Sequence, residues 1–537
     1  MGQQESSDGG RARAVAGPAL ADCFDEDELA LLRAAFKRGG EHGLDRSHFD
    51  AAFGSMLPSA AVDRFLERLA PGDGDGRRVA WDGWVDGLAR ACKAQPCAVD
   101  LGDANAARLG ALWDLMAARD ASPSAAVVTL DSHAHEPHGE EPGAGGALDE
   151  RALLALLVCC ARHCSDAHAL GGVSAMAPMA ADALLAGPLS RAAWVRWARA
   201  CVPLLGEAFE LLVMRGVAQL AAAARPAERT VRLAEQRLLP TLVGLNGQPA
   251  PDGAPPPSLV ITPALTWAIS LAVPQPASGA PTVLWRLLYS SAEHGLSQNR
   301  LSRHVVGYAG PTLLVVALAN GLSWGAYLDS PWAPTGAGRF FGGESCVLFL
   351  LAPRFHAFRA TRTSSNYCAF VQNVRAALGG GHGGHASRAH GAGHHPAGAD
   401  AELVGFGGSA KRYRCMLTDD LTSSVWRSAC STYETDTARL GALGLADDEA
   451  PQRVSALEVW GLGGVSADSA LHSVRLALEK GRAAAGRVNR SAFGETWHDS
   501  PDKMLMELGG HTFHSDQLRQ PERTPGADSS ARYAGRG

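Results

Sequence analysis

The feature that most constrains the fold is a change of sequence pattern near residue 283. From there to Gly463, apolar residues come in short runs rich in Val, Leu, Phe, Tyr and Trp, and each run is bounded by Gly, Pro or Ser. Runs this short are typical of strands joined by turns, so the pattern predicts a β-sandwich. The main runs are Thr312–Ala319, Ser323–Leu328, Cys346–Ala352, His356–Thr361, Tyr413–Thr418 and Ala456–Gly461.

A series of motifs in this region resembles the TLDc domain family. In chain order they are Trp285–Gly310, Gly325–Tyr327, Phe340–Gly342, Cys346–Leu350, Asn366–Tyr367, Gly405–Gly408 and Leu457–Gly461. The resemblance implies two packed antiparallel sheets with a few flanking helices, of which Gln298–Val306 would be the first. We place this TLDc domain at residues 274–464.

An insertion at 376–401 interrupts the domain and contains five histidines, His382, His385, His390, His394 and His395. Neutral imidazoles at close spacing bind zinc, nickel or copper. The surrounding Gly and Ala residues cannot fix a coordination geometry, so a flexible surface loop is the favoured interpretation. We predict no metal site and no cofactor.

The N-terminal half has helical periodicity. Leu29, Leu32 and Phe36 share helical spacing, and a Gly-rich turn separates them from Phe49 and Phe53. A second pair of amphipathic segments follows, on either side of residues 72–76. Two helix-loop-helix pairs in tandem resemble an EF-hand module.

The loops of these pairs match a calcium site poorly. With Gly76 at loop position six, Asp73 and Asp75 occupy positions three and five, but Pro71 falls at position one and Asp82 at position twelve. The first loop has Arg38 and Gly40 where acids are needed. A metal-free helical pair is favoured over a calcium-switched module.

Further helices are predicted at Ala106–Arg119, Leu148–Cys164, Arg191–Ala224 and Thr230–Leu239. The predicted organisation is therefore α+β and multidomain. Its parts are a disordered N-terminus at 1–22, an all-α, EF-hand-like region at 23–245, a linker at 246–273, the TLDc domain, and a C-terminal tail at 465–537. Within the linker region, Val260–Leu271 is an apolar lead-in to the domain.

Several polar residues invite an enzymatic interpretation, which we do not favour. Gly321–Gly325 matches the Gly-x-Ser-x-Gly pattern, but it connects two strand-like runs, whereas a nucleophile elbow needs a following helix. Ser290, Ser291 and His294 are better explained as a turn leading to a helix capped by Ser297, and Asp419-Asp420 as the end of a strand. We predict no catalytic residue.

Membrane attachment is predicted through a lipid. The chain begins Met1-Gly2-Gln3-Gln4-Glu5-Ser6, which has the spacing for N-myristoylation of Gly2. An unmodified tail is the alternative, and a single myristoyl chain would need a second anchor, such as a membrane-resident protein. The sequence contains no convincing membrane span or secretory signal. The scattered cysteines indicate a reducing compartment. The net charge of −6 gives no electrostatic reason to expect nucleic-acid binding.

The tail contains a short amphipathic helix at 501–508. Ser500-Pro501-Asp502 is a helix start, and Met504, Leu505 and Leu508 form an apolar stripe that could bind a groove on another protein. With the Met-Gly start and the EF-hand-like half, this tail resembles the lysosomal, mTOR-associated EAK-type group of TLDc proteins. That resemblance implies myristoylation, lysosomal residence, support of mTOR signalling, and binding of the vacuolar proton-pumping ATPase through the TLDc domain and this helix.

We therefore expect a non-enzymatic adaptor or regulator, cytoplasmic and peripheral on lysosomal, vacuolar or endosomal membranes. Its expected partners are vacuolar ATPase subunits, the mTOR complex and the membrane. The alternative is a cytosolic oxidation-resistance protein that protects against oxidative stress without a lipid.

Overall fold

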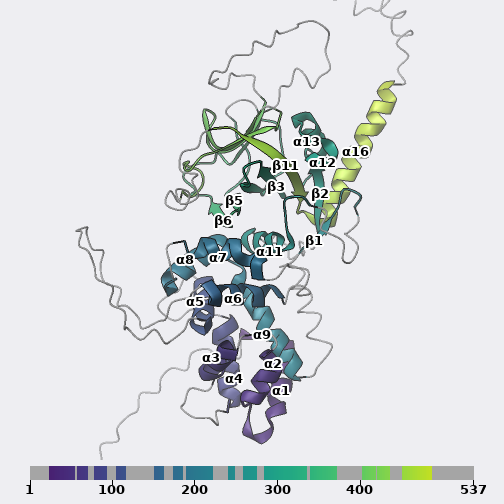
Figure 1. The fold of residues 1–537 in the computed structure, drawn as a ribbon. Coiled ribbons are helices and arrows are strands. Elements are labelled where there is room, and N and C mark those ends of the chain that lie inside the picture. The colour runs from purple at the N-terminus through teal and green to yellow at the C-terminus, as the bar shows by residue number, and fades with distance from the viewer. Residues whose placement is uncertain are drawn as a thin grey trace, which may run out of the picture. The chain divides into compact units, whose positions relative to one another are not determined.

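The structure is a computed structural model. It describes residues 23–54, 57, 59–69, 78–93, 104–116, 150–162, 173–185, 189–221, 240–247, 258–274, 284–335, 339–371, 402–418, 420–435 and 450–486. The chain divides into two compact units, Met1–Leu471 and His472–Gly537. In Figure 1 the helices of the first half are purple to blue, and the strands that follow are teal to green.

The first half consists of helices. They are α1 (Glu26–Phe36), η2 (Lys37–His42), α2 (Arg46–Phe53), α3 (Ser59–Leu69), α4 (Trp81–Leu88), η3 (Ala89–Lys93), α5 (Ala104–Met116), α6 (Glu150–Arg162), η4 (Val173–Met176), α7 (Ala177–Ala183), α8 (Arg191–Cys201) and α9 (Leu205–Ala221). Helix α1 begins with a capping box, in which Asp25 accepts from the backbone of Glu28 and Glu28 accepts from that of Asp25.

The two helix-loop-helix pairs share an aromatic core. Phe49 of α2 packs against Phe65 of α3 and Trp84 of α4, with ring centroids 6.1 and 5.8 Å apart. Their loops meet at an antiparallel bridge, in which the backbone N–H groups of Leu44 and Val79 donate to each other's carbonyls at 3.2 and 2.7 Å. Helices α1 to α4 therefore follow the predicted helix-loop-helix order, and α3 packs on both α2 and α4.

The prediction of one helical stretch over Arg191–Ala224 is wrong. The structure has two helices, α8 and α9, separated by residues 202–204. Pro203 explains the break, because proline lacks the N–H that a continuous helix needs and its ring clashes with the preceding turn. Val202 leaves the helical region with φ −141° and ψ 58°. The segment Thr230–Leu239 lies outside the described residues.

The second half is built on an antiparallel sheet system. Its strands are β2 (Leu284–Ser290), β3 (Thr312–Leu318), β4 (Ser323–Leu328), β5 (Val347–Ala352), β6 (His356–Arg359), β7 (Cys368–Val371), β8 (Leu403–Ser409), β9 (Arg412–Thr418), β10 (Ser423–Trp426) and β11 (Gln452–Gly461). The strand order is β6-β5-β4-β3-β11-β10-β9-β8-β7. Strand β2 pairs with β11, and β1 (Thr241–Val243) pairs with β2 in parallel.

Strand β11 links the two layers of the sandwich. One edge pairs with β3 along nearly its whole length, whereas the other edge pairs first with β10 and then with β2. The layers meet face to face, because Trp324 of β4 packs against Phe406 of β8 and Trp426 of β10, at 5.8 and 6.1 Å between centroids.

Alternate residues of β3 belong to different cores. Leu314 and Val316 point into the sandwich, and Leu313 and Val315 belong to a second core shared with the helices of the first half. Strand β3 is therefore buried on both faces, which explains its uninterrupted apolar sequence.

Helix α11 (Pro263–Ala272) lies within the segment predicted as a linker and is almost wholly buried. Its N-terminal approach is tied to β11 by Glu458, whose carboxylate accepts from the Ser258 hydroxyl and the Leu259 backbone, both at 2.7 Å. Trp460 also donates to Glu458, at 3.1 Å. The predicted apolar lead-in is thus a helix buried in the core beside the sheet.

Helix α16 (Gly464–Gly486) follows β11. A helical first half, a large antiparallel sheet and a C-terminal helix confirm the predicted α+β fold class. In the part of the chain that is described, no helix combines the length and apolar character that a membrane span requires.

Candidate functional site at the junction of helices and sheet

The residues predicted to attach the protein to membranes and partners, Gly2, Met504, Leu505 and Leu508, lie outside the described residues. The histidine-rich insertion and Asp73 and Asp75 of the second EF-hand-like loop also lie outside them.

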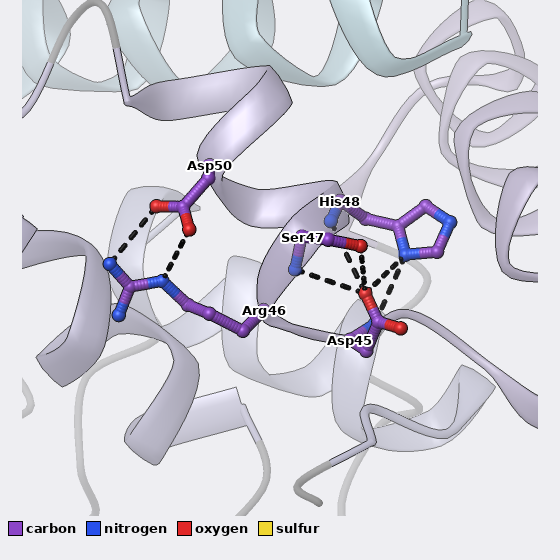
Figure 2. Close-up of polar contacts among 5 residues, drawn as sticks. All are labelled: Asp45, Arg46, Ser47, His48 and Asp50. Carbon is purple, nitrogen blue, oxygen red and sulfur yellow. Dashed lines mark hydrogen bonds and ion pairs between the residues drawn. The ribbon is translucent and has the colours of Figure 1, made fainter. Parts of the chain in front are cut away.

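In the first EF-hand-like pair, the acid at the end of the loop caps a helix. Figure 2 shows Asp45 at the N-cap of α2, where its carboxylate accepts from the Ser47 hydroxyl at 2.6 Å and lies 2.7 Å from Nδ1 of His48. The hydrogen bonds from Ser47 and then His48 lower the pKa of Asp45 to about 2. Arg46 pairs with Asp50 on the other side of the helix at 3.0 Å. Asp45 is therefore explained as a helix cap.

The serines and the histidine considered for catalysis take part in the fold. The Ser290 hydroxyl caps α12 (Ser291–His294), and the Ser291 hydroxyl accepts from the backbone of Leu457 at 2.9 Å. His294 Nδ1 accepts from the Ser290 backbone at 3.2 Å. Ser323 is the first residue of β4, so Gly321–Gly325 is a strand-turn-strand connection, as predicted.

The cap of α13 (Gln298–Val305) differs from the prediction. Ser297 occupies the N-cap position but forms no side-chain cap hydrogen bond. The backbone N–H of Gln298 instead donates to Asp420 at 2.6 Å. Asp420 follows β9, as predicted, and its φ of 54° places it in a left-handed turn. A residue distant in sequence has taken the capping role.

Among the described residues, one group of side chains brings together the donor atoms of a metal-binding site: Asp182, Cys201 and His356. Asp182 comes from α7, Cys201 ends α8 and His356 begins β6, so the helical region and the sheet both contribute. Asp182 and Cys201 are fully buried, and His356 is 7% exposed.

The three side chains converge through single atoms. His356 Nδ1 lies 2.8 Å from Asp182 Oδ2 and 3.3 Å from Cys201 Sγ. Cys201 Sγ lies 4.0 Å from the same carboxylate oxygen. Trp197 Nε1 also donates to that oxygen, at 2.9 Å.

The negative groups around His356 favour its charged form. Burial alone would lower the pKa of His356, but its electrostatic interaction with Cys201 and the hydrogen bonds to Asp182 and Cys201 raise it to about 10. A Cys–His–Asp relay needs the two imidazole nitrogens to have different partners, whereas here both partners face Nδ1. The geometry therefore differs from that of an acyl-transfer triad.

Arg359 reinforces the same junction from β6. Its Nε donates to the carbonyl of Ala200 at 2.8 Å, and its Nη2 donates to the carbonyl of Ala272 at 2.9 Å. These carbonyls lie at the C-terminal ends of α8 and α11, where partial negative charge accumulates. Burial lowers the pKa of Arg359. One guanidinium thus fixes two helix ends to the sheet.

A surface cavity of about 880 Å³ shares Arg359 and Ala200 with this junction. Five arginines and two acids contribute to its lining: Arg90, Arg191, Arg196, Arg199, Arg359, Asp114 and Glu434. In a chain with a net charge of −6, this is a local excess of positive charge that attracts anionic groups.

Sequence reasoning missed the Asp182–Cys201–His356 group because no local motif announces it. His356 is separated by 174 residues from Asp182 and by 155 from Cys201. The available signals were a histidine in a strand-like run and a cysteine at a helix end, neither of which indicates what lies opposite.

Comparison with known proteins identifies the sheet-bearing half. The TLDc domain profile matches residues 256–463. MTOR-associated protein MEAK7 of Xenopus laevis is 23% identical over 238 residues, 44% of this chain and 40% of that protein. The protein of the same name from Danio rerio is 26% identical over 240 residues, 44% of this chain and 42% of that protein.

A shorter similarity leads to a protein with a different name. Oxidation resistance protein 1 of Xenopus laevis is 34% identical over 77 residues, 14% of this chain and 9% of that protein. The aligned part spans about two fifths of the length of the MEAK7 relatives and far less of the length of Oxidation resistance protein 1.

Proposed function

We propose that this chain, which carries a TLDc domain, is a non-enzymatic adaptor or regulator at lysosomal or vacuolar membranes. In this proposal it binds the vacuolar proton-pumping ATPase, supports mTOR-type signalling, or does both. The observation that carries the proposal is the match of residues 256–463 to the TLDc domain, together with relatives that are named as mTOR-associated.

The structural roles of the catalytic candidates support an adaptor. Ser291 and His294 bind backbone groups, Asp420 caps α13, and both partners of His356 face one nitrogen. Strands β3 and β5 also bury both of their faces, so a partner would not bind an open sheet face there.

Two segments supply attachment in this proposal. Acylation of Gly2 would bring the protein to the membrane with marginal affinity, so a protein contact is needed as the second anchor. The helix at 501–508 would provide that contact by placing Met504, Leu505 and Leu508 in a groove of the partner.

The test is an affinity pull-down from detergent-solubilised membranes, with mass spectrometry of the bound proteins. Leu505→Asp places a charge on the apolar stripe, and Met506→Asp places the same charge on the opposite side of the predicted helix. Recovery of vacuolar ATPase subunits with the wild type and Met506→Asp, but not with Leu505→Asp, would support the proposal. Equal recovery with both variants would refute the role of the stripe.

A parallel experiment tests the lipid. Myristate incorporation and membrane fractionation are compared for the wild type, Gly2→Ala and Gln4→Ala. We expect Gly2→Ala alone to lose the label and move to the soluble fraction. A wild-type protein that takes up no myristate would refute membrane attachment through Gly2.

The second candidate function is protection against oxidative damage in the cytosol. It is favoured by the 34% identity to Oxidation resistance protein 1. It predicts that deleting the protein sensitises cells to peroxide and that the Gly2→Ala variant restores resistance fully. Failure of that variant to restore resistance would contradict a lipid-independent role.

A further inference from the structure

The junction between the helical region and the sheet contains a group of metal-binding side chains that the sequence did not predict. Asp182, Cys201 and His356 offer one oxygen, one sulfur and one nitrogen, which are the three donor types that zinc accepts in proteins. They are buried and come from three separate elements. We propose that they bind a zinc ion, which links α7 and α8 to β6.

The distances carry this proposal. The separations of the three donor atoms are 2.8, 3.3 and 4.0 Å. A triangle with these sides has a circumscribed radius of about 2 Å, close to the length of zinc bonds to nitrogen and oxygen and slightly below that to sulfur. An ion a little outside the plane of the three atoms would therefore reach all of them without movement of the backbone.

Hydrogen bonds alone explain the close approach of the three donor atoms less completely than a bound ion does. His356 Nδ1 has either one hydrogen or one lone pair, but both Asp182 Oδ2 and Cys201 Sγ lie within hydrogen-bonding distance of it. The nitrogen can therefore form a well-aligned hydrogen bond with only one of these two atoms. A metal ion at the common point would serve all three atoms at once.

The surroundings are those of a structural metal site. Trp197 Nε1 donates to Asp182 Oδ2 at 2.9 Å, which orients the carboxylate in the way that outer-shell partners orient metal ligands. The Phe358 ring lies 4.6 Å from the His356 ring, between centroids, and limits the space on that side. The second carboxylate oxygen of Asp182 or a water molecule would complete four-fold coordination.

The mixture of donors selects the ion. Calcium and magnesium prefer sites made only of oxygen, whereas a thiolate with an imidazole and a carboxylate suits zinc or a similar divalent transition metal. Because the donors are brought together only when the helices rest on the sheet, binding would stabilise that arrangement.

Cobalt is a suitable probe, because a Co²⁺–thiolate bond gives a charge-transfer band in the near ultraviolet. The full-length protein is stripped of metal with a chelator and titrated with Co²⁺, and Zn²⁺ is then added. The histidines at 382–395 can bind Co²⁺ as well, but the insertion at 376–401 contains no cysteine. It therefore cannot produce this band.

The variants are Cys201→Ser and Cys92→Ser, which each replace one buried thiol by a hydroxyl. We expect a band that saturates at one Co²⁺ per chain in the wild type and in Cys92→Ser, disappears on adding Zn²⁺, and is absent in Cys201→Ser. A wild-type protein without the band, or a Cys201→Ser variant that keeps it, would overturn the proposal.

X-ray absorption of the zinc-loaded protein provides a test that keeps Cys201 in place, in case Cys201→Ser does not fold. One sulfur neighbour per site-bound zinc is the expected result. The insertion histidines are first replaced by glutamine, so that only the buried site is occupied. A coordination shell of nitrogen and oxygen alone would refute the assignment.

Discussion

Replacing Arg359 by alanine should weaken the attachment of the helical region to the sheet. The guanidinium donates to the last turn of α8 at 2.8 Å and to the end of α11 at 2.9 Å, through the carbonyls of Ala200 and Ala272. Alanine removes both hydrogen bonds and creates none. The end of α8 would keep the contact of Cys201 with His356, and the end of α11 would keep the hydrogen bond from Leu204 to the Leu271 carbonyl, but neither would be bound to Arg359.

The magnitude follows from the two hydrogen bonds. Each bond from a charged group contributes roughly 1.5–3 kcal/mol, so we expect the loss of both bonds in Arg359→Ala to lower the free energy of unfolding by at least about 3 kcal/mol. Arg359→Lys keeps the charge but has no fork to span both carbonyls, so it should lose about half of that.

The assay is urea unfolding of the full-length protein, followed by tryptophan fluorescence and by limited proteolysis of the helical region. Arg362→Ala is the matched control, because its side chain is 76% exposed and pairs with Glu344, which is 61% exposed. Such a surface pair contributes about 1 kcal/mol at most. An Arg359→Ala protein no less stable than Arg362→Ala would refute the clamp.

Three further predictions concern the helical region. Gly216→Ala should destabilise the fold by about 1–3 kcal/mol, measured by urea unfolding, because a Cβ there would lie 2.1 Å from the Phe53 ring. Asp45 has a pKa lowered to about 2, so its contribution to stability is present above the ordinary value of 3.8 and is lost as pH falls towards 2. Asp45→Asn should therefore lose less stability than the wild type between pH 4 and pH 2, and equal acid sensitivity would contradict this. Added calcium should leave the melting temperature unchanged, because the second loop has Pro71 at position one and the shorter Asp82 at position twelve, and a calcium-dependent rise would restore the calcium-switched module.

The strands were predictable because local sequence determines their limits. Ser323–Leu328 was predicted with the bounds that β4 has. Gly321, whose φ of 86° suits glycine, lies in the turn before β4, and the polar residues Asp329 and Ser330 follow the strand. The two-sided burial of β3 likewise left a visible mark, because a strand covered on both faces has no polar alternation.

The features that the sequence could not predict depend on distant partners. Nothing near Ser297 indicates that Asp420 will cap α13, and nothing near His356 indicates that Asp182 and Cys201 lie opposite it. Such contacts depend on how the helical region rests on the sheet, and that arrangement is fixed by packing of apolar surfaces instead of by a local motif. The error at α8 and α9 is of another kind, since Pro203 was visible and should have ended the helix.

The most direct test of the adaptor proposal is binding of the purified full-length protein to purified vacuolar ATPase in lipid nanodiscs. The account predicts saturable binding by the wild type and by Met506→Asp, and binding at least tenfold weaker, about 1.4 kcal/mol, for Leu505→Asp. Absence of saturable binding by the wild type, or equal affinity of the two variants, would contradict it.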